Sequence, residues 1–209
     1  QEVTVTAPDE AAAIPQPNDA QPIVLFSDTL AGDKFVSVWN SNWWNAPVYS
    51  EGDIDGNKYA RYEITDLGTA GGVVGLEFGV EFGAVDASEK TALNFDMYVE
   101  TGITRIEVIL SSDAGDTVYN ITNPTAGEWI SHETLFTDMT GAAGDLDPST
   151  LKFIGLKLWG DAGKAIYVDN IYFSGDAVFS ELEVTVEDSS NAAIADAVVS
   201  VGSTSAESK

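Results

Sequence analysis

The chain has 209 residues and a formal net charge of −25, which comes from 34 acidic and 9 basic side chains. Binding to nucleic acid is not expected, because phosphate recognition depends on Lys and Arg. The sequence contains no cysteine, which excludes disulfides, cysteine-ligated zinc and a cysteine nucleophile, and its 44% hydrophobic residues are enough to fill a core.

Residues 1–21 contain no Lys, Arg or aromatic residue and are rich in Ala, Pro and Gln. This composition is typical of a linker, although the segment from Val3 to Thr6 alternates as a short extended strand does. The chain begins at Gln1 rather than Met, so we expect a product trimmed after removal of a secretion signal. Strong acidity and the lack of cysteine favour an exported bacterial protein, secreted or at the cell surface, from a marine setting.

Residues 22–175 hold every Trp and Tyr, and their 23 acidic and 8 basic side chains give this part a net charge of −15. Apolar and polar residues alternate there with the two-residue period of half-buried strands. The clearest of these expected strands are residues 73–82, 93–99, 106–110, 153–159 and 166–173.

Turn signals such as Asp55-Gly56 separate the strands, and helical periodicity is scarce. About ten short strands at intervals of roughly 8–12 residues predict an all-β protein, an antiparallel β-sandwich of the jelly-roll type. No apolar run approaches the roughly 20 residues of a membrane span, so membrane insertion is not expected.

Several segments resemble one known family in their order along the chain. They are Ile23–Asp28, Val38–Trp44, Gly56–Tyr59, Gly127–Trp129 and Ile166–Phe173. Over about residues 22–174 the sequence resembles the β-jelly-roll carbohydrate-binding modules attached to secreted bacterial glycoside hydrolases, especially those that act on marine polysaccharides such as laminarin. The resemblance implies a jelly roll whose partner is a polysaccharide.

Residues 176–209 form the third part of the chain. The stretches Leu182–Asp188 and Ala193–Val201 resemble the opening strands of an immunoglobulin-like or carboxypeptidase-regulatory-like module. We therefore expect a linker followed by the first strands of such a module, as the N-terminal portion of a longer multi-domain protein.

Aromatic side chains near residue 40 are the leading candidates for a sugar-binding site. Apolar faces of sugar rings stack on aromatic rings, while amides and carboxylates bind the hydroxyls. The candidate ligand-binding residues are Trp39, Trp43, Trp44, Asn42, Asn45, Tyr49 and Trp159. Because neighbours in an extended strand point opposite ways, one of Trp43 and Trp44 is expected in the core, and packing between the sheets is the alternative for each ring.

The family resemblance also implies a structural calcium ion where the first strand meets the last. Asp169 matches that position best, and Asp28 is the second candidate ligand. Calcium takes 6–8 oxygen ligands, which an acidic chain supplies readily. The alternative is that Asp169 only binds backbone groups at a strand edge.

We find no sequence signal for catalysis. No nucleophile elbow, P-loop or His-rich metal motif is present, and His132 is the only histidine. The preferred interpretation is a non-catalytic module that binds a neutral, glucan-type polysaccharide, a role compatible with attachment to a larger glycoside hydrolase. The alternative is a structural or adhesive subunit of an extracellular surface assembly, in which strands make contacts between neighbouring copies of the chain.

Overall fold

A computed structural model describes residues 7–17, 21–31, 35–65, 70–78, 81, 83–141 and 146–175, together with the backbone of 198–201 and 204–207. The chain divides into two compact units, Gln1–Ala177 and Val178–Lys209. In the described part of the second unit, β13 (Val198–Val201) and β14 (Thr204–Glu207) form an antiparallel hairpin. The predicted strands Val3–Thr6 and Leu182–Asp188 lie outside the described residues, and the immunoglobulin-like module stays a prediction.

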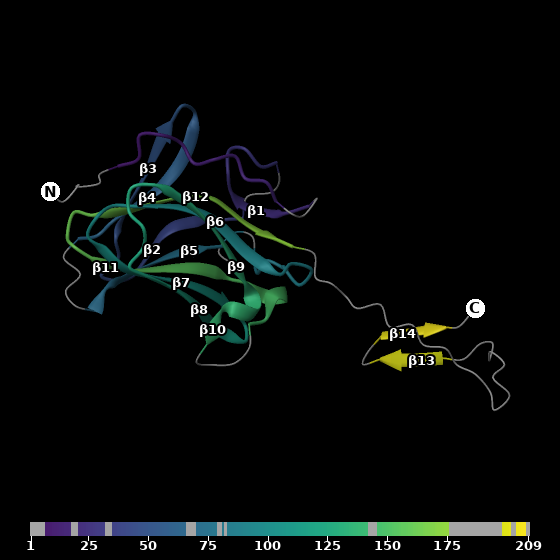
Figure 1. Ribbon diagram of the computed structural model, residues 1–209. Helices are drawn as coiled ribbons and strands as arrows, with labels where there is room; N and C mark the ends of the chain where they lie inside the picture. The colour runs from purple at the N-terminus through teal and green to yellow at the C-terminus, as the bar shows by residue number, and fades with distance from the viewer. Residues whose placement is uncertain are drawn as a thin grey trace. The chain divides into compact units, whose positions relative to one another are not determined.

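The first unit contains two antiparallel sheets (Figure 1). Sheet A has the order β3 (Val48–Ile54), β4 (Asn57–Glu63), β12 (Ala165–Ser174), β6 (Ala92–Val99) and β9 (Trp129–Leu135), with β1 (Ile23–Phe26) also paired to β12. Sheet B has the order β10 (Thr140–Gly141), β8 (Gly115–Thr122), β7 (Ile103–Ser112), β11 (Phe153–Gly160), β5 (Gly72–Glu77) and β2 (Val38–Trp44). The predicted all-β, antiparallel sandwich is therefore confirmed.

The core lies between the sheets and follows the predicted alternation. On β7 the residues Ile106, Val108 and Leu110 are buried, whereas Glu107 and Ile109 face the other side and are only partly covered. The strand predicted over 73–82 is described up to Phe78, with Leu76 and Phe78 fully buried. Val80 and Phe82 lie outside the described residues.

The strand β6 departs from the expectation of one solvated face, because all eight of its residues are buried. Residues 7–17, which we call the N-terminal strap, run over the outer face of sheet A and cover part of it, including β6 (Figure 1). Two side chains of the sheet hold the strap: Trp129 Nε1 donates to the carbonyl of Glu10 at 2.8 Å, and Asn170 Nδ2 donates to the carbonyl of Ala13 at 3.2 Å. The strap thus supplies a layer that strand periodicity alone does not predict.

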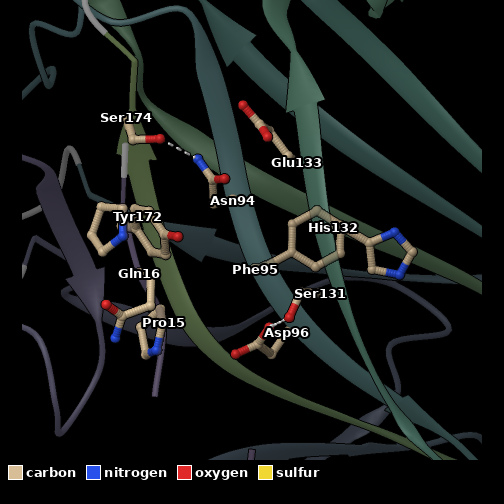
Figure 2. A pocket seen from close by; sticks show the side chains of 11 residues that line it. Pro15, Gln16, Asn94, Phe95, Asp96, Ser131, His132, Glu133, Tyr172 and Ser174 are labelled. Carbon is tan, nitrogen blue, oxygen red and sulfur yellow. Dashed lines mark hydrogen bonds between the residues drawn. The ribbon is translucent and has the colours of Figure 1, made fainter. Parts of the chain in front are cut away.

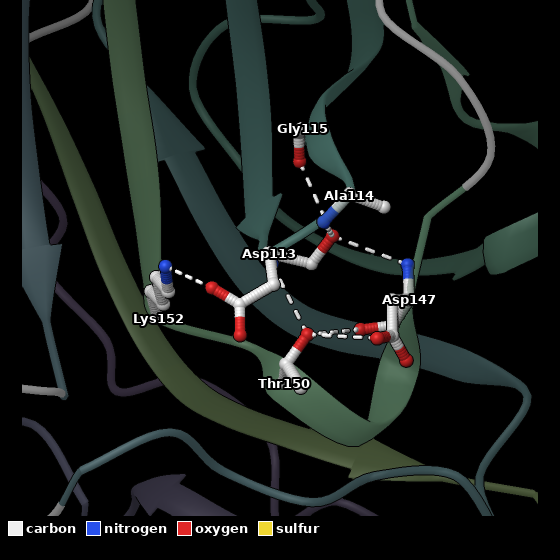
Figure 3. Close-up of polar contacts among 7 residues, drawn as sticks. Asp113, Ala114, Gly115, Asp147, Thr150 and Lys152 are labelled. Carbon is white, nitrogen blue, oxygen red and sulfur yellow. Dashed lines mark hydrogen bonds and ion pairs between the residues drawn. The ribbon is translucent and has the colours of Figure 1, made fainter.

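One end of sheet B is fixed by a polar network between the β7–β8 turn and the short 3-10 helix η3 (Pro148–Thr150), shown in Figure 3. Asp147 caps η3 by accepting from the backbone N–H of Ser149. The backbone N–H of Asp113 donates to Thr150 Oγ1, and Lys152 pairs with the Asp113 carboxylate. A second 3-10 helix, η2 (Phe136–Asp138), follows β9. In the described part of the chain no helix is long or apolar enough to span a membrane.

Candidate functional site: an aromatic face on sheet B

The indole ring of Trp43 lies over the outer face of sheet B, on top of two glycines. A Cβ built on Gly75 would lie 2.3 Å from Trp43 Cζ2, and one on Gly155 would lie 3.5 Å from Cζ3. Phe153 packs edge-on against the ring, with centroids 4.6 Å apart, and Trp43 Nε1 donates to Glu77 Oε1 at 3.3 Å. The ring is fixed on three sides and still 41% exposed, as an aromatic platform must be.

Trp44 lies beside Trp43 on the same face. The register of β2 against β5 shifts between Asn42 and Trp44, so the two successive Trp side chains do not alternate in the ordinary way. Trp44 is 46% exposed, and the expectation that one of the pair lies in the core is wrong for this reason. Both rings border a shallow cavity of about 500 Å³, lined also by Val73, Glu77, Ile109, Asp116 and Phe153.

Trp39 and Tyr49 do not belong to this face. Trp39 packs against the core edge-on to Phe26 at 4.8 Å and stacks on Tyr49 at 6.2 Å between centroids. The Tyr49 hydroxyl donates to Glu51, and burial followed by this carboxylate raises the pKa of Tyr49. Both residues are partly buried and pack at the edge of the core. Packing between the sheets is the alternative to sugar binding for these rings.

The two predicted asparagines lie at the rim of β2. Asn42 is exposed and pairs with Val74, whose side chain points into the core, so the register places Asn42 away from the Trp43 ring. Asn45 is exposed in the turn after β2 and has a left-handed backbone, with φ of 42°. Glu77 and Asp116, and not the predicted amides, are the polar side chains that line the aromatic cavity.

Trp159 occupies the other end of the same outer face. Two cations lie over its ring: the Arg105 guanidinium is 4.5 Å and Lys157 Nζ is 4.6 Å from the ring centroid. Both cations also pair with the single carboxylate of Glu107. Phe153, Lys157 and Trp159 are alternate residues of β11, and the same two-residue period could have identified Phe153 from the sequence.

The calcium candidates lie at the junction of β1, β4 and β12. Asp169 is buried and accepts from Asn57 Nδ2 at 2.9 Å, while the exposed Asp28 accepts from the backbone N–H of Lys58 at 2.7 Å. The Oδ1 atom of Asn57 is buried and has no hydrogen-bond partner. Burial, together with the nearby carboxylates of Asp96 and Asp28, raises the pKa of Asp169 to about 6. Among the described residues, no group of three or more acidic or histidine side chains forms a metal cluster.

Next to this junction, Asn170 connects four parts of the molecule. Its amide donates to Asp96 Oδ2 at 2.7 Å and to the strap at Ala13, and its Oδ1 accepts from Ser27 at 2.7 Å. Ser131 also donates to Asp96, as Figure 2 shows, and burial raises the pKa of Asp96 even so. Sequence reasoning did not identify this network, because its members lie far apart in the chain.

A polar cavity of about 280 Å³ adjoins this network, between sheet A and the end of the strap (Figure 2). Pro15, Gln16 and Pro17 form its strap side, and Asn94, Asp96, Glu133 and Tyr172 are among the residues on its sheet side. The ring of His132 stacks on Phe95, with centroids 4.8 Å apart. Burial lowers the pKa of His132.

Comparison with solved structures finds carbohydrate-binding modules. A family 11 carbohydrate-binding module of a cellulosomal cellulase of Clostridium thermocellum has a TM-score of 0.54 and 16% identity, over 77% of this chain and 98% of that module. A family 30 module has a TM-score of 0.58 and 13% identity, over 75% and 99%. A family 30 module of a second cellulosomal cellulase of the same organism has 0.54 and 13%, over 74% and 97%. No protein-family model and no curated protein matches the sequence. The structural likeness shows a shared β-sandwich fold.

Proposed function

We propose that the sandwich is a non-catalytic carbohydrate-binding module and that it binds sugar on the outer face of sheet B. The observation that carries this proposal is the placement of Trp43, close over Gly75 and partly exposed beside Trp44. Two exposed indoles on a rigid sheet present apolar surface at little cost in side-chain entropy, and the C–H faces of a pyranose match that surface.

Polar groups around the rings supply the second half of the recognition. Glu77 and Asp116 face the cavity and can accept hydrogen bonds from sugar hydroxyls. Because Glu77 already accepts from the Trp43 indole, it also fixes the ring that it borders. Binding of this kind needs no covalent step and has modest affinity, since the hydroxyls lose water when they bind.

A neutral, glucan-type polysaccharide fits this face better than an anionic one. The two cations of the face, Arg105 and Lys157, both pair with Glu107, which weakens their attraction for an anionic sugar. The carboxylates at the aromatic end repel a uronate or sulfate group.

We also propose a structural calcium ion between Asp169 and Asp28. The unpartnered, buried Oδ1 of Asn57 and the raised pKa of Asp169 support it, because a cation there would satisfy the first and favour the charged form of the second. Asp169, Asp28 and the Asn57 amide oxygen would hold the ion. It would stabilise the β1–β12 junction and take no part in sugar contact.

The wider setting follows from the sequence. We place the module in an exported, multi-domain protein outside the cell, where polysaccharide is found. A structural or adhesive subunit of a surface assembly is the second candidate, supported by the extended N-terminal strap that already covers one face of the sandwich.

Tryptophan fluorescence during titration with laminarin tests the proposed function. We expect a saturable change in emission that is lost in Trp43→Ala and Trp44→Ala. Trp129→Phe is the matched control, because Trp129 lies on sheet A and its removal takes away a partly exposed indole without touching the sheet B face. Unchanged emission with laminarin and every other neutral glucan would contradict sugar binding at this face.

A further inference from the structure

On the outer face of sheet A a cluster of aromatic rings lies beneath the N-terminal strap, and we call this patch the furrow. Tyr98, Ala165 and Tyr167 are buried there as one cluster, with Tyr59 and Trp129 packed against it. The rings are steeply inclined to one another: Tyr98 makes an angle of 60° with Trp129 and 86° with Tyr167. Rings so inclined to one another do not share the single flat surface on which a sugar stacks.

The buried side chains of the strap are small or cyclic. Pro8 and Ala12 are buried, and Asp9 is close enough to Tyr98 to help raise the pKa of its phenol, after the larger effect of burial. At the far end, Pro15 and Pro17 border the cavity that Tyr172 lines. An extended segment with proline and alanine at intervals fits a groove with aromatic walls.

The hydrogen bonds between the sheet and the strap go to the backbone of the strap. Trp129 and Asn170 both donate from side chains of the sheet, and both acceptors are main-chain carbonyls, those of Glu10 and Ala13. Surfaces rich in aromatic side chains are known to bind extended, proline-rich peptides. The face therefore has the chemistry of a peptide-binding site.

We propose that this furrow also accepts the strap of a second copy of the chain, so that two molecules are linked by strap exchange. The strap has no helix or strand of its own, and only residues 18–22 separate it from β1 in the sequence. An exchanged strap would recreate every contact that it makes within its own chain, so the exchange costs little contact energy. The partner is thus residues 7–17 of another molecule.

Two full-length variants test this proposal by complementation. Ala12→Asp places a charge in the buried part of the strap and leaves the furrow intact; Trp129→Ala removes the furrow's indole donor and leaves the strap intact. Each variant alone is expected to sediment as a monomer. Their equimolar mixture is expected to form a 1:1 complex of twice the mass, in a fraction that rises with concentration. A mixture that stays monomeric at every concentration overturns the proposal.

A labelled peptide with the sequence of residues 7–17 provides the second readout. It is expected to bind the Ala12→Asp variant, whose furrow is vacated, and to bind the unaltered chain and Trp129→Ala at least tenfold more weakly. A scrambled peptide of the same composition is the control, because it keeps the charge and the prolines but not their spacing. Equal binding to all three proteins, or equal binding of the scrambled peptide, overturns the inference.

Near-ultraviolet circular dichroism confirms that the variants are folded. Where Ala12→Asp does not fold, Pro8→Asp changes the other buried strap residue and takes its place in both measurements. Loss of folding in both variants would mean that the sandwich cannot fold without its own strap in place. That result also overturns exchange between chains. Laminarin binding is not part of either readout, so the result does not depend on the proposed sugar site.

Discussion

Trp43 occupies the space above Gly75 that any other side chain would need. The ideal Cβ of residue 75 would lie 2.3 Å from Cζ2 and 2.4 Å from Cη2 of the indole, well inside van der Waals contact. Gly75 therefore determines the position of the aromatic platform, although the glycine itself offers no group to a ligand.

Gly75→Ala is expected to displace the Trp43 ring and to reduce laminarin affinity at least tenfold. Relief of the overlap also costs stability, about 1–3 kcal/mol as for other overpacked sites. Gly155→Ala is the graded comparison, because its Cβ would lie 3.5 Å from the same ring. Calorimetric titration measures both. Equal affinity in Gly75→Ala and the unaltered protein would show that the Trp43 platform does not bind sugar.

Trp159→Ala is expected to weaken binding of long glucans and to leave short ones unaffected. Trp159 is four residues beyond Gly155 on β11, which is roughly 13 Å along the strand, so only an extended chain reaches both ends of the face. Affinity measured against a series of oligosaccharides of increasing length checks this. A uniform loss at all lengths would mean that Trp159 supports the sheet and makes no contact with the ligand.

Asn170→Ala is expected to destabilise the sandwich by about 3 kcal/mol, since it removes buried hydrogen bonds and leaves Asp96 without one of its donors. The backbone of Asn170 is left-handed, with φ of 49°, which adds strain for alanine. Asn123 has the same φ of 49° but is exposed, so Asn123→Ala isolates the backbone contribution, about 1 kcal/mol. Urea unfolding measures both, and equal losses in the two variants would rule out a role for the Asn170 network.

Chelation is expected to lower the melting temperature, because an ion held at the proposed Asp169 site would stabilise only the folded chain. Asp169→Asn should abolish the difference between calcium and chelator, whereas Asp138→Asn, an exposed acid on η2, should preserve it. Differential scanning calorimetry makes the comparison. A melting temperature that is identical with calcium and with chelator argues against the ion.

His132 is expected to titrate with a pKa below 6.5, because burial against Phe95 disfavours the imidazolium. A depressed folded-state pKa means that the native state binds its proton less tightly than the unfolded state. The stabilising contribution is thus present above pH 6.5 and is lost as the pH falls through the folded-state pKa. As the only histidine, it gives a single assignable imidazole signal in proton NMR. A midpoint at or above 6.5 would contradict the buried stack.

Strand periodicity predicted most of the sandwich, because burial between two sheets imposes the two-residue alternation directly on the sequence. The failure at β6 has a physical cause: Asn94, Asp96 and Tyr98 are polar or amphipathic like a solvated face, but they are covered by a strap from the start of the chain. Polarity there serves hydrogen bonds to buried partners, as Asp96 illustrates with Ser131 and Asn170.

The aromatic site could be predicted only in part. Trp43, Trp44 and Trp159 were identified by residue type, and they do lie on one outer face. The register shift within β2 could not be predicted, since it depends on how β2 pairs with β5. The sequence around Trp39 is as rich in Asn and Ser as the sequence around Trp43 and Trp44. Trp39 nevertheless packs at the core against Phe26 and Tyr49, because of how the strands are arranged in the fold.

The covering of sheet A has a consequence for valency. With part of sheet A under the strap, a single molecule with the proposed sugar site on sheet B would present one binding face and would not bridge two polysaccharide chains. Two molecules joined through their straps would present two such faces, each held at a high effective concentration by the other. A pair of this kind would link two glucan chains, whereas a monomer would bind only one.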